Sequence, residues 1–138
     1  MVVVTSAAEA KARGLRPLAR IVAQASFAQE PTWFTTAPVG CIKKVLAKAG
    51  LKTTDIDLWE INEAFAVVPM ALMNELKVSH DIVNVNGGAC ALGHPIGASG
   101  ARILVTLIHA LQARGKKRGL ATLCIGGGEG TAMAIELV

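Results

Sequence analysis

Apolar residues recur at helical spacing in three segments of the chain. Within each segment they fall three or four residues apart, so they share one face of a helix. The pattern predicts helices over residues 38–49, 63–76 and about 96–112. Pro38 suits the first turn of the first helix, and Gly50 suits its end, because glycine accepts the left-handed conformation common there. The apolar face of the last helix is formed by Ile103, Leu104, Leu107, Ile108 and Leu111.

Short apolar runs between these helices predict strands. The resulting order, β-α-β-α-β-α-β-β, indicates an α/β sheet that is mainly parallel, with its last strand antiparallel. A further short strand at 1–5 and a helix at 7–13, capped by Ser6, precede this series. The predicted strands of the main series are residues 20–27, 56–61, 82–85, 119–123 and 131–138.

Glycine-rich loops follow two of the predicted strands. One contains His94 and leads into the long helix, and the other runs from Cys124 through Gly126 to Gly128. Glycine permits close approach of a ligand or of another helix, so both loops suit a site. Because functional groups of α/β sheets gather at the carboxyl ends of the strands, we expect these loops and Asn62, which also follows a strand, on one rim.

These polar side chains also have structural interpretations. His94 can be a loop histidine that hydrogen-bonds to backbone, and Asn62 stands where the N-cap of the next helix belongs. An amide at such a corner can equally hold a water or a ligand carbonyl. Trp33 and Phe34 lie in a predicted loop over residues 29–37, where they either cover the core or line an apolar pocket.

The composition is typical of one globular domain. The chain has 138 residues, of which 52% are hydrophobic and 17% charged, with a net charge of +4. No apolar run reaches the about 20 residues of a bilayer span, and the basic residues are scattered without interleaved aromatics, so neither a membrane nor a nucleic acid is expected as a partner. Residues 1–5 lack the basic region of a secretory signal, and three cysteines lie far apart. We therefore expect no disulfide framework, no metal site and a cytoplasmic location.

Three blocks of sequence resemble those of the thiolases, the acetyl-CoA acetyltransferase and 3-ketoacyl-CoA thiolase family. They are NEAFA at residues 62–66, GHPIGASG at 93–100 and CIGGG at 124–128. The resemblance covers essentially the whole chain and matches the C-terminal half of a thiolase. It implies a thiolase-like C-terminal domain with a mixed five-stranded sheet and helices on both faces. It also implies coenzyme A thioesters as substrates, without a separate cofactor, in the condensation of two acetyl-CoA to acetoacetyl-CoA or in the thiolytic cleavage of 3-ketoacyl-CoA.

The resemblance also implies roles for catalytic residues. His94 would activate a nucleophilic cysteine and donate to a first oxyanion hole, which Asn62 would complete through a water. Cys124 would act as the acid/base that moves the α-proton or protonates the departing thiolate. The Gly126 N–H would serve a second oxyanion hole.

Three further residues would contact the acyl and pantetheine end of the substrate, namely Phe65, Ala64 and Phe34. Biosynthetic members of the family commonly have methionine at the position of Phe34. This difference bears on the preferred length of the acyl chain.

The resemblance assigns the nucleophilic cysteine to an N-terminal half that this sequence does not contain. Residues 1–15 would be a remnant strand and helix of that half, and residues 16–138 the C-terminal domain. Neither Cys41 nor Cys90 matches the nucleophile motif, and Cys90 is expected to be a buried thiol. The expected partners are an acyl-CoA, the missing half or another copy of the chain, and a homo-oligomer is expected.

Two hypotheses follow for the chain by itself. Either it is part of an enzyme and inactive without the nucleophile, or it is a non-catalytic module of thiolase fold that serves coenzyme A binding or assembly. A relationship to β-ketoacyl synthases is less favoured, because those enzymes typically use two histidines where this chain has His94 and Cys124.

Overall fold

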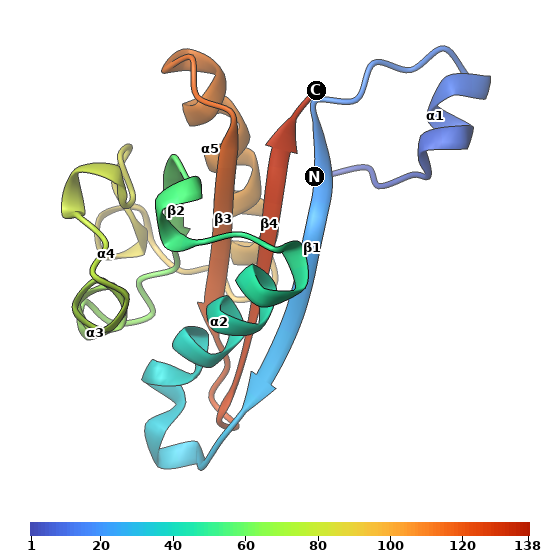
Figure 1. Ribbon diagram of the computed structural model, residues 1–138. Helices are drawn as coiled ribbons and strands as arrows, with labels where there is room; N and C mark the ends of the chain where they lie inside the picture. The colour runs from blue at the N-terminus through green and yellow to red at the C-terminus, as the bar shows by residue number, and fades with distance from the viewer.

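A four-stranded sheet forms the centre of the structure, a computed structural model that describes residues 1–138 (Figure 1). The strands are β1 (Ala19–Ala28), β2 (Leu58–Ile61), β3 (Arg118–Cys124) and β4 (Glu129–Leu137), in the order β1-β4-β3-β2. β2 and β3 pair in parallel, whereas β4 is antiparallel to both β1 and β3. The predicted α/β class is confirmed, and β4 alone runs against the other strands, as expected of the last strand.

The fifth strand expected at 82–85 is reduced to a single bridge. Only Val83 pairs with β2, through Trp59. Asn84 has a φ of 47°, which ends the extended conformation. Its side chain then replaces the missing backbone ladder: the Ile61 N–H donates to Oδ1 at 2.8 Å, and Nδ2 donates to the Ile61 carbonyl at 2.9 Å. The expectation of five strands is therefore corrected to four.

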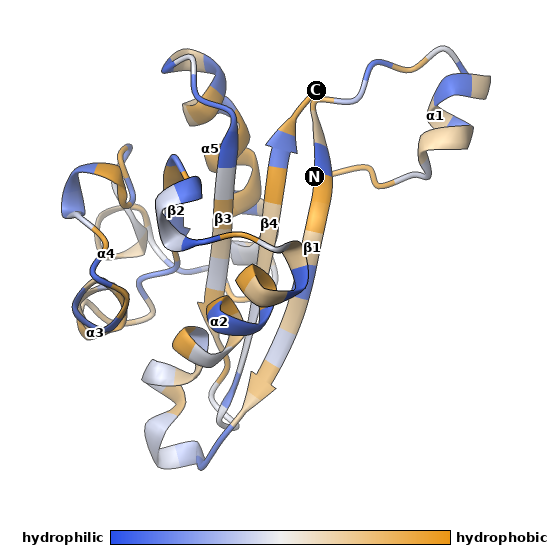
Figure 2. Ribbon diagram, viewed as in Figure 1, coloured by the Kyte–Doolittle hydropathy of each residue, from blue (hydrophilic) through white to orange (hydrophobic).

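Helices cover both faces of this sheet, as predicted. α2 (Ala37–Ala49) and α3 (Val67–Leu76) share one core of 15 buried residues with the strands. α5 (Ser99–Ala113) packs on the opposite face over a core of 7 buried residues. The hydropathy colouring shows the strands as largely apolar (Figure 2). The remaining elements are short: α1 (Ala7–Ala12), α4 (Ala89–Leu92), and the 3-10 helices η1 (Pro31–Thr36), η2 (Thr53–Asp55) and η3 (His80–Ile82).

The α2 helix follows the sequence prediction closely. Pro38 lies in its first turn, and Gly50 ends it with a φ of 66°. Gly40 allows α2 to lie against β1, because a Cβ at this position would come within 2.5 Å of the Phe27 ring. Glycine is thus required here by contact between the helix and the sheet.

Several predicted boundaries and environments were wrong. α3 begins at Val67 and not at residue 63, since residues 62–66 form a corner before the helix. The segment expected as a loop at 29–37 contains η1. Cys90 is exposed, although a buried thiol was expected, because it lies in the first turn of the short α4 at the surface.

The N-terminal segment differs from the rest of the chain. Residues 1–5 are exposed and form no strand, because no other strand lies beside them to pair with. The predicted helix follows as α1, and the Glu9 N–H donates to the Ser6 Oγ at 3.1 Å, as expected of an N-cap. α1 stands away from the sheet (Figure 1).

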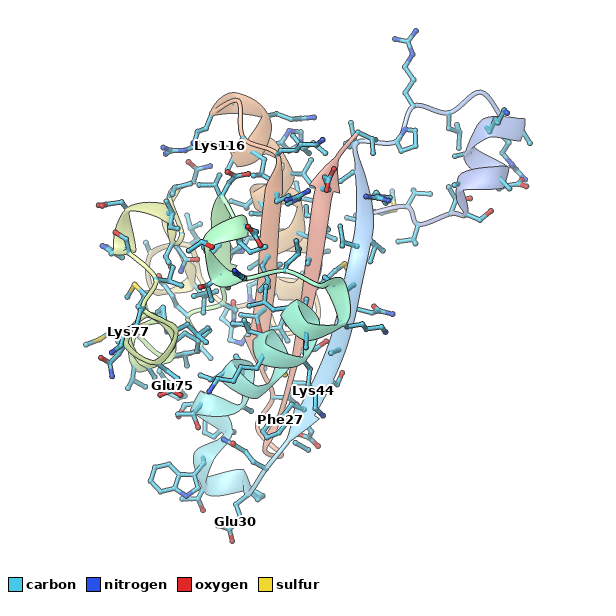
Figure 3. The ribbon with its side chains drawn as sticks, in the orientation of Figure 1. Phe27, Glu30, Lys44, Glu75, Lys77 and Lys116 are labelled. Carbon is cyan, nitrogen blue, oxygen red and sulfur yellow. The ribbon has the colours of Figure 1, made fainter.

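The basic side chains are spread over the surface of the molecule. Lys44, Lys77 and Lys116 lie on separate parts of the molecule (Figure 3), which agrees with the scattered basic residues of the sequence. Among the helices of this structure, none combines the length and the apolar character needed to cross a membrane.

Candidate active site

The carboxyl ends of β2 and β3 bring two predicted site residues to one edge of the sheet. Ile61 is paired in register with Thr122. Directly after β2, the Asn62 N–H donates to the Thr122 carbonyl at 2.9 Å. Cys124 ends β3 only two residues later. The parallel pairing of these strands therefore places Asn62 and Cys124 on the same rim, as the sequence predicted.

His94 reaches the same rim from the loop that follows α4. Its Nδ1 lies 2.6 Å from the Ser99 Oγ, and its Nε2 lies 3.4 Å from the Asn62 Nδ2. The Ser99 hydroxyl donates to the Pro95 carbonyl at 3.1 Å, so its oxygen accepts from His94 Nδ1–H. This assigns the neutral ring the Nδ1–H tautomer and leaves Nε2 as an acceptor that faces Asn62.

Asn62 is fully buried and does not cap a helix. The N-cap of α3 is Ala66, so the structural interpretation of Asn62 as a cap is wrong. Its side chain is 0% exposed, and its Oδ1 has no hydrogen-bond partner within the chain. A buried amide oxygen without a donor is costly, so this atom suits a water or a ligand group.

Cys124 is a buried thiol, 8% exposed, that makes no hydrogen bond to His94. Burial raises the pKa of the Cys124 thiol above its ordinary value, with a smaller opposing effect from its own backbone. The thiol therefore stays protonated at neutral pH, as a proton donor requires.

Gly126 lies in the exposed turn between β3 and β4. A Cβ built on it would meet nothing within 4 Å, and its N–H makes no backbone hydrogen bond. The N–H is thus free to donate to an external acceptor. The turn itself is fixed by Gly128, which has a φ of 100° and approaches the Gln29 carbonyl too closely for any side chain.

The three predicted substrate-contact residues lie beside this rim. The rings of Phe34 and Phe65 meet edge to face with centroids 6.2 Å apart, and Phe65 is 58% exposed. Ala64 packs against the larger core. Phe34 is partly buried against the larger core, so the exposed Phe65 ring is the apolar surface of this pair that a ligand could contact.

A buried charged pair next to the site was missed by sequence reasoning. Glu60 in β2 is 1% exposed, and its Oε2 lies 3.5 Å from the Arg102 Nη1 in α5. Burial raises the pKa of Glu60 to about 7, although Arg102 opposes the shift; Glu63 adds to it. The available signal was a lone carboxylate within the apolar run of residues 58–61.

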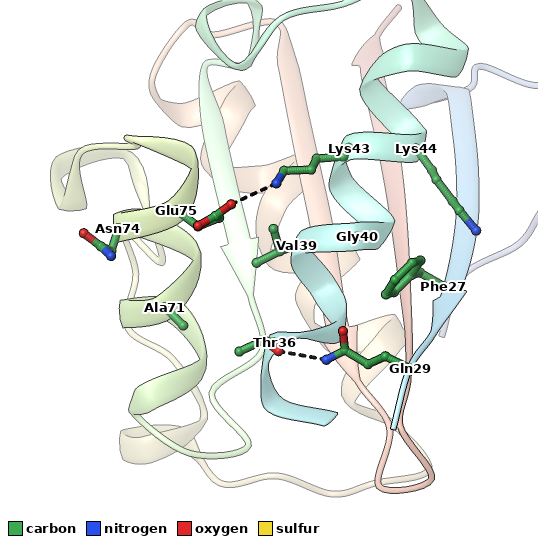
Figure 4. A pocket seen from close by; sticks show the side chains of 10 residues that line it. All are labelled: Phe27, Gln29, Thr36, Val39, Gly40, Lys43, Lys44, Ala71, Asn74 and Glu75. Atoms are coloured by element: carbon green, nitrogen blue, oxygen red, sulfur yellow. Dashed lines mark hydrogen bonds and ion pairs between the residues drawn. The ribbon is translucent and has the colours of Figure 1, made fainter. Parts of the chain in front are cut away.

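A separate groove of about 680 Å³ lies between α2 and α3 (Figure 4) and contains none of the predicted site residues. The Lys43 Nζ and the Glu75 Oε1 form an ion pair across it at 2.9 Å, and the Gln29 Nε2 donates to the Thr36 Oγ1 at 2.8 Å. The groove is lined by Phe27, Gln29, Thr36, Val39, Gly40, Lys43, Lys44, Ala71, Asn74 and Glu75.

Nowhere in the chain do three or more histidine, cysteine or acidic residues gather as a metal site would require.

Comparison with known families accounts for this arrangement. Residues 15–137 match the model of the family described as "Thiolase, C-terminal domain". The chain belongs to the thiolase family. The predicted resemblance is confirmed, and the chain corresponds to the C-terminal domain of these proteins.

Curated relatives of this thiolase domain are acetyl-CoA acetyltransferases. The chain is 58% identical over 134 residues to the acetyl-CoA acetyltransferase of Escherichia coli, covering 97% of this chain and 34% of the relative. It is 52% identical to the cytosolic acetyl-CoA acetyltransferase of Mus musculus, covering 98% of this chain and 34% of that relative. The chain thus spans about a third of the length of the curated relatives it matches.

Solved structures agree with the sequence relatives. The acetyl-CoA acetyltransferase of Bacillus anthracis superposes with a TM-score of 0.93 at 47% identity, covering 96% of this chain and 34% of that chain. The Acat5 thiolase from Ascaris suum, solved in complex with coenzyme A, gives a TM-score of 0.91 at 46% identity with the same coverage.

Proposed function

We propose that this thiolase domain supplies the acid/base and oxyanion-binding half of an active site that acts on coenzyme A thioesters. The reaction would be the condensation of two acetyl-CoA to acetoacetyl-CoA, or the reverse thiolytic cleavage of a 3-ketoacyl-CoA. The nucleophilic cysteine would come from a thiolase region outside these 138 residues. The observation that carries the proposal is the Ser99–His94–Asn62 array at the sheet edge that also holds Cys124.

In the first step, His94 would take the proton of the external thiol. With Nδ1–H bound to Ser99, its Nε2 is the free acceptor for that proton. In condensation the thiolate would attack the thioester carbonyl of the first acetyl-CoA, forming an acyl-cysteine and releasing the coenzyme A thiolate, which would take a proton from Cys124. In cleavage it would attack the 3-keto carbonyl instead, and the acetyl-CoA carbanion would depart. Protonated Nε2, together with a water held by Asn62, would stabilise the oxyanion that develops.

Cys124 would act as the acid/base in both directions. In condensation the Cys124 thiolate, left after its proton has gone to coenzyme A, would take the α-proton of the second acetyl-CoA. In cleavage its protonated thiol would donate to the carbanion of the departing acetyl-CoA. The free Gly126 N–H would donate to the enolate oxygen that forms in either direction.

The acyl and pantetheine end of the substrate would be contacted by Phe65, Ala64 and Phe34. We also propose that the protein is cytoplasmic and that it forms a homo-oligomer.

The proposal is tested by thiolysis of acetoacetyl-CoA. The purified chain would be assayed alone and after mixing with a separately produced N-terminal portion of a thiolase. We expect no turnover by the chain alone, because it lacks the nucleophile, and turnover in the mixture. His94→Ala and Cys124→Ala in the chain should each abolish that turnover, and Lys116→Gln, an exposed residue just before the start of β3 at the other end of the sheet, should not.

Either of two results would contradict the proposal. Turnover by the chain alone would show that Cys90 or Cys41 serves as nucleophile. A mixture that forms a complex by size-exclusion chromatography but cleaves no acetoacetyl-CoA would favour a non-catalytic binding or assembly module.

A further inference from the structure

We propose that Glu63 is a positioning residue whose carboxylate fastens the loop that carries His94 to the end of β2, and so sets His94 against Asn62. The proposal deepens the function proposed above and rests on it, because the placement of His94 has a chemical consequence only in that reaction. Glu63 itself touches neither His94 nor the site where substrate would bind; it acts through the loop.

Both oxygens of the Glu63 carboxylate are occupied by the loop. The Asn84 Nδ2 donates to Oε1 at 2.9 Å, and the Cys90 N–H donates to Oε2 at 3.0 Å. The two donors lie six residues apart at the two ends of the segment 84–90. One carboxylate therefore joins both ends of this segment to the corner that follows β2.

Asn84 fixes the first end of the segment directly to β2. Its side chain exchanges two hydrogen bonds with Ile61, and its N–H donates to the Trp59 carbonyl at 2.8 Å. The residue adopts a left-handed φ of 47°, which asparagine tolerates better than most residues. The Asn84 side chain is thus bonded to both the N–H and the carbonyl of Ile61 in β2. Its further bond to Glu63 ties the same side chain to the corner that follows β2.

Gly88 shows that the loop passes directly over the carboxylate. A Cβ built on Gly88 would lie 2.2 Å from the Glu63 Cδ and 2.3 Å from its Oε1. Real side chains do not approach so closely, so any side chain at position 88 would displace the Glu63 carboxylate. This steric observation is independent of the hydrogen bonds and indicates the same contact.

Only a short, hydrogen-bonded connection separates Cys90 from His94. α4 spans Ala89–Leu92, and the Gly93 N–H donates to the Ala89 carbonyl at 2.8 Å. His94 is the next residue. A shift of α4 at Cys90 is therefore passed on to the imidazole, which is held on its other side by Ser99.

Glu63 remains a carboxylate under ordinary conditions. Burial pushes its pKa upward, but the hydrogen bonds from Cys90 and Asn84 outweigh burial and hold the pKa of Glu63 below its usual range. Hydrogen bonds to a charged acceptor are stronger than neutral ones, which suits a residue that fastens a loop.

The test replaces Glu63 in the full 138-residue chain and observes His94 without any need for turnover. Glu63→Gln keeps the size of the side chain but presents an NH₂ group to one of the two donors. We expect the Cys90 amide to exchange its hydrogen about tenfold faster, as the loss of a charge-assisted hydrogen bond implies. In long-range ¹H–¹⁵N spectra, the His94 ring nitrogens should shift from the Nδ1–H pattern toward a mixture of tautomers.

Matched variants separate positioning from general loss of structure. Glu75→Gln removes an exposed carboxylate of α3 and should leave both signals unchanged. Gly88→Ala, with Glu63 intact, should reproduce the His94 shift, because the new methyl group displaces the carboxylate. Glu63→Asp, which retains the charge on a shorter side chain, should give an intermediate His94 shift and serves if Glu63→Gln does not fold.

The proposal would be overturned if the His94 nitrogen signals are unchanged in folded Glu63→Gln, even if the Cys90 amide exchanges faster. If Glu63→Asp is used instead, unchanged signals in that variant would overturn it in the same way. In the thiolysis mixture, Glu63→Gln should lower kcat with little change in KM, because His94 is displaced while the substrate contacts remain. If the wild-type mixture is inactive but the His94 signals shift as expected, the proposed function fails and the positioning contact stands.

Discussion

The two faces of the sheet are built differently. The face covered by α2 and α3 holds a core of 15 buried hydrophobic residues, whereas the face covered by α5 holds 7. On the α5 side, the buried polar residue Glu60 lies in β2, buried Asn62 directly follows β2, and Ser99 is buried in the first turn of the helix. One face resembles the centre of an ordinary domain, and the other combines a smaller core with a polar cluster.

This difference separates the groups that orient His94 from most of the apolar core, although Cys124 belongs to the larger core. The larger apolar core holds the strands in register, and so fixes where β2 and β3 end. The polar side chains on the other face, together with the loop fastened by Glu63, then orient His94 at that edge. Buried polar groups cost free energy unless they are paired, so the α5 face gives up stability for a defined arrangement of its site.

The largest expected effect distinguishes the two cores by truncation. Leu120 lies in the larger core and Leu107 in the smaller one, and both are 0% exposed. Each change to alanine should lower the free energy of unfolding by about 2–5 kcal/mol, through lost transfer energy and a new cavity. We expect Leu120→Ala near the upper end, because it removes packing from the larger core, and Leu107→Ala near the lower end, because the smaller core leaves fewer buried neighbours around the gap.

Urea unfolding of the two variants against the unchanged chain provides the measurement. Equal losses, or a larger loss for Leu107→Ala, would mean that the core under α5 contributes at least as much to stability as the larger core. This would contradict the difference between the two faces.

A smaller effect is expected from the buried carboxylate on the polar face. Because the pKa of Glu60 in the folded state is raised to about 7, its contribution to stability is full below the pKa of the unfolded chain and is lost as the pH rises through about 7. Glu60→Gln cannot ionise. Relative to the unchanged chain, this variant should therefore gain on the order of 1–3 kcal/mol in free energy of unfolding between pH 5 and pH 8.

Unfolding midpoints of Glu60→Gln and of the unchanged chain, measured across this pH range, show whether the variant gains or loses stability as the pH rises. A matched variant, Glu136→Gln, removes a carboxylate whose pKa is instead lowered by hydrogen bonds from Arg118 and Lys117, and it should show no such gain with rising pH. A Glu60→Gln variant that loses stability relative to the unchanged chain as the pH rises would show that Arg102 keeps Glu60 ionised.

The sequence predicted the elements that depend on local pattern. The helix at 38–49, the final hairpin and the glycine-rich loops all follow from apolar spacing and from glycine or proline at element ends. The rim that joins Asn62 and Cys124 followed from the expectation that β2 and β3 are parallel, which the structure confirms.

The predictions that failed depend on contacts between distant residues. Asn84 replaces a strand by bonding to Ile61, and Glu63 holds a segment more than twenty residues away, neither of which any local pattern encodes. The bond between Ser99 and His94 could not be predicted from local pattern, because it needs the turn at Pro95 to fold back. Glu60 and Gly88 did leave signals: a charge within an apolar strand, and a glycine without an evident turn.

The polar face presents His94 in one defined orientation, and the position of the proton on its ring reports that orientation. A long-range ¹H–¹⁵N spectrum of the unchanged chain at a pH where the imidazole is neutral reports which nitrogen carries the proton. We expect a proton on Nδ1, donated to Ser99, with Nε2 unprotonated toward Asn62. A proton on Nε2, or rapid averaging between the two tautomers, would contradict it.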